Sequence, residues 1–135
     1  MKLVHITKTF YPDTPKEVKA LTDISLSFEK GEFATLSGES GSGKTTLLNI
    51  IGGLDSATSG QIFLDNVEIS AYNKEKMAKL RLHDIGFIFQ AYNLIHVLTV
   101  RENIGFIMKL LKFDDKERVI TSRESKYFIV RTPLG

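Results

Sequence analysis

The chain has 135 residues, of which 42% are hydrophobic and 25% charged, a balance that predicts one globular domain and not a disordered or fibrous protein. A net charge of +2, with basic and acidic residues interspersed, gives no reason to expect a nucleic-acid partner. The absence of cysteine excludes disulfides, thiolate metal sites and thiol catalysis. No apolar run suits a secretion signal or a membrane span, so we expect a chain that neither crosses a membrane nor is exported by that route.

The first half of the chain alternates short apolar segments with turn residues. Strands are predicted over 3–7, 20–29, 33–37, 61–64 and 67–69, because these segments are β-rich, short or close to period two. The two prolines within 11–15 predict a loop, and Asp65-Asn66 predicts a tight turn. Helical spacing of apolar residues predicts a helix over 45–51, which Gly52-Gly53 would end.

The second half continues with a predicted amphipathic helix over 74–82 and a nearly all-apolar strand over 85–89, of the kind buried in parallel sheets. A further helix is predicted over 99–112, where Thr99 and Glu102 have the spacing of a capping box. The tail, 119–135, holds one predicted strand at 127–130 and no room for another helix, so the sheet is expected to be incomplete.

Residues 38–46 read Gly-Glu-Ser-Gly-Ser-Gly-Lys-Thr-Thr and satisfy the P-loop pattern, between a predicted strand and a predicted helix. Glycines at these positions allow consecutive N–H groups to point into one concavity and bind phosphate oxygens. Lys44 would reach the β- and γ-phosphates, and the Thr45 hydroxyl would coordinate Mg²⁺. The predicted cradle is Gly38, Ser40, Gly41, Ser42, Gly43, Lys44, Thr45 and Thr46. The alternative is a glycine-rich turn with an exposed lysine.

Several other segments agree with one family: 18–33, 47–55, 58–60, 85–90 and 98–104. With the glycine loop, they resemble the nucleotide-binding subunit of ABC transporters, most closely the lipoprotein-releasing and macrolide or peptide exporters, over residues 1–118. The resemblance implies an α/β P-loop NTPase fold with an N-terminal antiparallel β part, and ATP and Mg²⁺ as ligands. A GTPase fits worse, because Asn73-Lys74 lacks the Asp of a base reader, while a small-molecule kinase remains possible from the loop alone.

The resemblance also implies roles for residues outside the loop. Phe10, or its neighbour Tyr11, would stack on adenine, although an aromatic residue there could equally be packing. Gln90 would be the catalytic glutamine that contacts Mg²⁺ or the attacking water. Residues 93–99 would face a transmembrane permease through Leu94, Ile95 and Val97, unless these three belong to the core. The chain would then lie in the cytoplasm at the inner face of the membrane, with a second ATPase subunit as a further possible partner.

The tail departs from the family pattern. It has no Leu-Ser-Gly-Gly-Gln signature and no strand ending in Asp-Glu. If residues 129–135 are a shortened form of the family's strand and the acidic pair after it, Arg131 and Thr132 stand at the positions of that pair. An unrelated end that contains a strand is an equal interpretation. Because arginine cannot anchor Mg²⁺ and threonine is a poor base, we expect MgATP binding without efficient hydrolysis. A non-catalytic interaction module and an unstable remnant of a broken gene are the alternatives, so whether the chain is an enzyme stays open.

Overall fold

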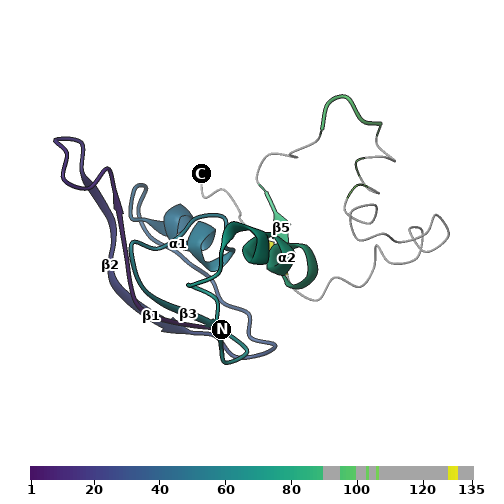
Figure 1. The fold of residues 1–135 in the computed structure, drawn as a ribbon, viewed down its shortest axis with the longest axis horizontal. Coiled ribbons are helices and arrows are strands. Elements are labelled where there is room, and N and C mark those ends of the chain that lie inside the picture. Colours follow the sequence, from purple (N-terminus) through teal and green to yellow (C-terminus); the bar gives the residue numbers. More distant parts are fainter. Residues whose placement is uncertain (90–94, 100–102, 104–105, 107–127, 131–135) are drawn as a thin grey trace. The chain divides into compact units, whose positions relative to one another are not determined.

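A computed structural model describes residues 1–89, 95–99, 103, 106 and 128–130 of the chain (Figure 1). The chain divides into two compact units, residues 1–77 and 78–135. The division falls inside helix α2 (Lys74–Asp84). The glycine loop and both aromatic candidates, Phe10 and Tyr11, belong to the first unit.

The first unit is built on a four-stranded antiparallel sheet in the order β2-β1-β3-β4. Strand β1 (Lys2–Phe10) is flanked by β2 (Val18–Ser27) and β3 (Ser59–Leu64) (Figure 1). Strand β3 also pairs with the short β4 (Val67–Glu68). The N-terminal antiparallel part that the family resemblance implies is therefore confirmed. Its strands exceed the predicted ranges by one to three residues at several ends, because main-chain pairing continues past the apolar positions.

The turn between β3 and β4 is the tight hairpin that its sequence predicts. Leu64 lies opposite Val67, and the two residues between them, Asp65 and Asn66, have φ angles of 48° and 65°. Two consecutive left-handed residues are the mark of a type I′ turn, which Asp and Asn accept more easily than most residues do. This turn sets the register of the hairpin.

The apolar core of the first unit lies between the sheet and helix α1 (Lys44–Ile51). Leu47 and Ile50 are the buried residues of α1, and their spacing of three puts both on one helix face. The helix lies against β2. The full set of buried apolar residues in the described chain is Leu3, Ile6, Leu21, Leu47, Ile50, Ile62 and Ile69.

The strand predicted over 33–37 is wrong. The segment forms neither helix nor strand, and Phe33 is 87% exposed. A strand needs a neighbour to satisfy its main-chain groups, and among the described residues no strand pairs with this segment. The apolar composition of 33–37 is therefore present without the pairing that would make it a strand.

In the second unit, β5 (Gly86–Ile88) pairs in parallel with β6 (Phe128–Val130), as its all-apolar composition predicts. The expected burial is wrong, because Ile88 and the following Phe89 are exposed. Within the described ranges, β5 has one neighbouring strand, β6, and so only one of its edges is paired. The rings of Phe87 and Phe89 stack on each other at 5.6 Å between centroids.

Most of the helix predicted over 99–112 lies outside the described residues, as does Glu102 of the predicted capping box. Asn103 is helical, and its N–H donates to the carbonyl oxygen of Thr99 at 2.9 Å. The side-chain amide of Asn103 also accepts from the N–H of Ile95 at 2.8 Å and donates to the carbonyl oxygen of Leu98 at 3.0 Å. Asn103 thereby holds the segment 95–99 in its turn.

Truncation of Ile6 should show how far the first unit depends on its central strand. Ile6 is 0% exposed on β1, which is paired on both sides. Ile6→Ala should lower the free energy of unfolding by about 2–5 kcal/mol, through lost apolar burial and the cavity left behind. Leu26→Ala, on the exposed part of β2, is the control and should cost much less. Urea denaturation measures both, and equal losses would contradict this view of the core.

Candidate functional site

The glycine loop of residues 38–43 joins the irregular segment after β2 to the first turn of α1. Gly38, Gly41 and Gly43 have φ angles of 152°, 80° and 87°, a region that side chains disfavour. Glycine-rich turns with such angles are the kind of backbone in which successive N–H groups can face one anion. Gly38 to Ser42 are exposed, so a ligand can reach the loop.

Gly43 is the point at which the loop touches the sheet. It is the N-cap residue of α1 and has no side chain to cap the helix. A Cβ atom on Gly43 would lie 2.5 Å from the carbonyl oxygen of Ala20 and 3.0 Å from Cδ2 of Leu21, both on β2. Only glycine fits at this distance and at this φ angle, so the loop and the start of α1 are held directly on β2.

Lys44 folds back over the loop that precedes it. Its Nζ donates to the carbonyl oxygen of Gly38 at 2.7 Å, to that of Glu39, and to Oγ of Ser42 at 3.2 Å. The ammonium therefore sits within the turn of the loop, close to the N-terminus of α1. The first turn of α1 contains no acidic residue to offset these positive charges. The loop, the lysine and the helix end together suit a multiply charged anion.

The two threonines after Lys44 lie in the first turn of α1. Thr45 is exposed, and Thr46 is half-buried. Because Leu47 and Ile50 define the buried face of the helix, the Thr45 side chain stays accessible beside the loop. Its hydroxyl is a hard oxygen donor, which suits Mg²⁺, an ion that takes few protein ligands when phosphates supply the rest. In the described ranges, no group of three or more His, Asp or Glu side chains could hold a metal ion.

The two aromatic candidates differ in their surroundings. Phe10 ends β1, is half-buried and lies opposite Val18 of β2. Tyr11 is 67% exposed in the following turn and has a φ angle of 51°. Ala20, two residues along β2 from Val18, is the residue that Gly43 approaches. Strand β2 thus brings Phe10 and the glycine loop into one part of the first unit.

The remaining candidates belong to the second unit. Gln90 and Leu94 lie outside the described residues. Ile95 and Val97 are both exposed, Val97 to 89%, so these two residues are not part of a core.

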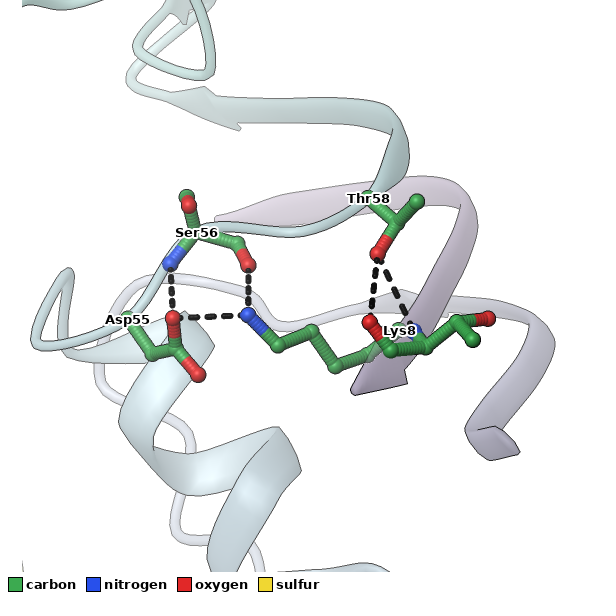
Figure 2. Close-up of polar contacts among 5 residues, drawn as sticks. Lys8, Asp55, Ser56 and Thr58 are labelled. Carbon is green, nitrogen blue, oxygen red and sulfur yellow. Dashed lines mark hydrogen bonds and ion pairs between the residues drawn. The ribbon is translucent and has the colours of Figure 1, made fainter. Parts of the chain in front are cut away.

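One feature of the first unit was missed by the sequence reasoning. Nζ of Lys8 donates to Oδ1 of Asp55 and to the carbonyl oxygen of Ser56, each at 2.7 Å (Figure 2). The same Nζ lies 4.9 Å from the centroid of the Phe10 ring. Lys8 and Phe10 are two apart on a strand, a spacing that favours a shared face, but no sequence signal points to a partner 47 residues away.

Comparison with known proteins assigns the family. A family profile described as "ABC transporter" matches residues 21–131, and the chain belongs to this family. The chain is 42% identical to an uncharacterized ABC transporter ATP-binding protein, MJ0796, of Methanocaldococcus jannaschii, over 77% of this chain and 44% of that protein. It is 39% identical to the lipoprotein-releasing system ATP-binding protein LolD of Buchnera aphidicola, over 97% of this chain and 55% of that protein.

The macrolide export ATP-binding/permease protein MacB of Neisseria gonorrhoeae is 43% identical over 81% of this chain and 17% of its own length. Among solved structures, the dimeric post-hydrolysis state of the MJ0796 cassette bound to ADP and Pi matches with a TM-score of 0.78 and 39% identity, over 87% of this chain and 51% of that chain. The fold is that of an ABC ATPase cassette, as predicted. The chain spans about half the length of MJ0796 and LolD.

None of the helices in the described part of the chain has the length and apolar character needed to cross a membrane.

Two glycine substitutions in the loop should have different costs. Gly43→Ala forces a methyl group against the Ala20 carbonyl and should destabilise the first unit by about 2 kcal/mol or more, from backbone strain and steric overlap together. Gly41→Ala has a similar φ angle, but nothing lies within 4 Å of its added Cβ, so only the backbone strain remains. Chemical denaturation compares the two. A Gly43→Ala variant no less stable than Gly41→Ala would rule out the close contact with β2.

Proposed function

We propose that this chain binds MgATP through the loop of residues 38–46, as an ATP-binding part of an exporter of the lipoprotein-releasing or macrolide type. The observation that carries the proposal is the geometry of the loop, in which three left-handed glycines and the folded-back Lys44 converge at the start of α1. The family membership and the ADP and Pi bound to the MJ0796 cassette support it.

In this proposal, each loop residue has a defined task. The N–H groups from Gly38 to Thr46, with those of Ser40 and Ser42 among them, donate to phosphate oxygens. Lys44 holds its charge within the loop through Gly38, Glu39 and Ser42, and a phosphate oxygen would replace one or more of these three acceptors. The Thr45 hydroxyl would hold Mg²⁺, which neutralises phosphate charge when bound.

For the base, we favour Phe10 over Tyr11. Phe10 is held at the end of β1 and is connected through β2 to the loop, whereas Tyr11 is exposed in a turn. An aromatic face that is already fixed loses less freedom when a base stacks on it. Gln90 remains a proposed Mg²⁺ and water contact by resemblance to the family.

We further propose that these 135 residues turn over ATP slowly. Phosphoryl transfer depends on groups that place the attacking water and stabilise charge around the γ-phosphate. Arg131 and Thr132 would not replace an acidic pair at that position, whichever interpretation of the tail holds. The subdivision into an ATP-binding part, 1–118, and a divergent tail, 119–135, stays a prediction.

The proposed partners are a transmembrane permease and a second ATPase subunit, which would place the chain at the inner face of the cell membrane. Two relatives support this class of partner, since MacB is an ATP-binding/permease protein and LolD belongs to a lipoprotein-releasing system. The exposure of Ile95 and Val97 suits a protein contact in the second unit. The same exposure favours the second candidate function, a non-catalytic module that docks on such a partner.

Titration of MgATP by calorimetry tests the proposed binding. The purified chain should bind MgATP saturably, and Lys44→Ala should weaken binding by at least about tenfold, because a charge-assisted contact to the phosphates is lost. Lys30→Ala removes another exposed lysine outside the loop and is the matched control. Phosphate release measured in the same samples should stay near background.

Each departure from that pattern has a definite meaning. Absence of MgATP binding would reject the proposed ATP-binding function and leave the non-catalytic docking module as the better candidate. Binding with turnover that disappears in Lys44→Ala would reject the proposal of slow hydrolysis.

A second titration tests the role of Thr45. ATP binding is measured with Mg²⁺ and again with EDTA, for the unmodified chain and for Thr45→Ala. Loss of the hydroxyl should remove most of the gain in affinity that Mg²⁺ gives, while binding in EDTA changes little. Thr45→Ser keeps the hydroxyl and should restore the Mg²⁺ effect. An unchanged Mg²⁺ effect in Thr45→Ala would place the metal contact elsewhere.

A further inference from the structure

The Lys8 ammonium is largely removed from water although its partners come from a distant part of the chain. Its side chain is 11% exposed, and two of its three N–H donors go to Oδ1 of Asp55 and to the carbonyl oxygen of Ser56 (Figure 2). The Phe10 ring occupies the remaining side, at 4.9 Å from Nζ to the ring centroid. A cation in this position is attracted by the ring face, and more strongly when it is desolvated.

The segment that holds Lys8 is itself attached to the C-terminal end of α1. The N–H groups of Leu54 and Asp55 both donate to the carbonyl oxygen of Asn49, at 2.8 and 3.2 Å. The N–H of Ser56 donates to Oδ1 of Asp55 at 2.7 Å, which orients the carboxylate toward Lys8. The glycine loop lies at the N-terminal end of α1. The ion pair connects the opposite, C-terminal end of this helix to Lys8, whose ammonium lies over the Phe10 ring.

A second set of contacts fixes the same segment on β1. The N–H of Thr58 donates to the carbonyl oxygen of Thr7 at 2.8 Å, and Oγ1 of Thr58 accepts from the N–H of Thr9 at 3.0 Å. Lys8 lies between these two strand residues. The main chain on both sides of Lys8 is thus fixed to the segment that carries its acceptors, Asp55 and Ser56.

We propose that Lys8, held by Asp55, is a positioning residue for Phe10 and strengthens its stacking on the nucleobase. Lys8 covers one face of the ring and restricts its rotation, which leaves the opposite face for the base. A cation also draws π-electron density toward itself, so the opposite face repels the electron-rich face of a base less. This inference rests on the proposed ATP binding and on Phe10 as the stacking residue.

The proposal predicts that Lys8 affects binding of the base and not binding of the phosphates. Because Lys8 acts through Phe10, its loss should weaken the binding of ligands that carry a base. The binding of ligands that carry only phosphates should not change. A purely structural ion pair predicts a different result, because a loosened first unit would weaken both kinds of ligand. Comparison of ATP with inorganic tripolyphosphate, each with Mg²⁺, distinguishes the two roles.

The test is a titration of both ligands against the full chain and Lys8→Met. ATP affinity should fall by about 3- to 10-fold, because the ring is no longer held in place and polarised by the cation, and tripolyphosphate affinity should stay the same. Lys8→Arg keeps a cation that can bind Asp55 and should recover most of the ATP affinity. Lys19→Met removes an exposed cation of the adjacent strand and should change neither affinity.

A double-mutant comparison makes the test specific to the ring. Phe10→Leu should weaken ATP binding by itself, and Lys8→Met added to Phe10→Leu should produce no further loss. The positioning role would be overturned if Lys8→Met weakened ATP and tripolyphosphate binding equally. It would also be overturned if Lys8→Met lowered the ATP affinity of Phe10→Leu as much as it lowers that of the unmodified chain. In both cases the Lys44-dependent binding of MgATP would still stand. If the unmodified chain did not bind MgATP at all, the proposed function would be overturned, and this inference with it.

Discussion

The contact between Gly43 and the carbonyl group of Ala20 is the constraint on which the candidate site depends. It places the last residue of the glycine loop directly on β2, at a distance that no side chain would permit. Everything that follows Gly43 in the chain, including Lys44 and helix α1, starts from this point. The burial of Leu47 and Ile50 then holds the helix in the same orientation through apolar packing.

Both ends of α1 are connected to the sheet, by different kinds of contact. The N-terminal end uses the steric fit of Gly43 on β2, and the C-terminal end uses the ion pair of Lys8 with Asp55. The ends of β1 and β2 that receive these contacts also pair with each other, at Phe10 and Val18. The glycine loop and the aromatic candidate are therefore connected through the same two strands, an arrangement that would reduce the entropy cost of binding a nucleotide if the loop holds its phosphates.

Sequence reasoning succeeded where the decisive information is local. The glycine loop, the helix after it and the Asp65-Asn66 turn each depend on backbone angles that a few residues determine. It was wrong for 33–37 and for the burial of β5, because composition does not say whether a neighbouring strand is present. The preference for Phe10 over Tyr11 gained its physical support only from the pairing of β1 with β2 and from the cation above the ring.

The sequence by itself determined the short N-terminal strands, the glycine loop and the family to which the chain belongs, since these follow from short patterns and from residue types at fixed spacing. Tertiary structure alone decided which strand the loop rests on, and it brought Asp55 to Lys8 across 47 positions of the chain. The physical reason is that burial and pairing are properties of segments brought together by folding, whereas backbone conformational preference is a property of neighbouring residues.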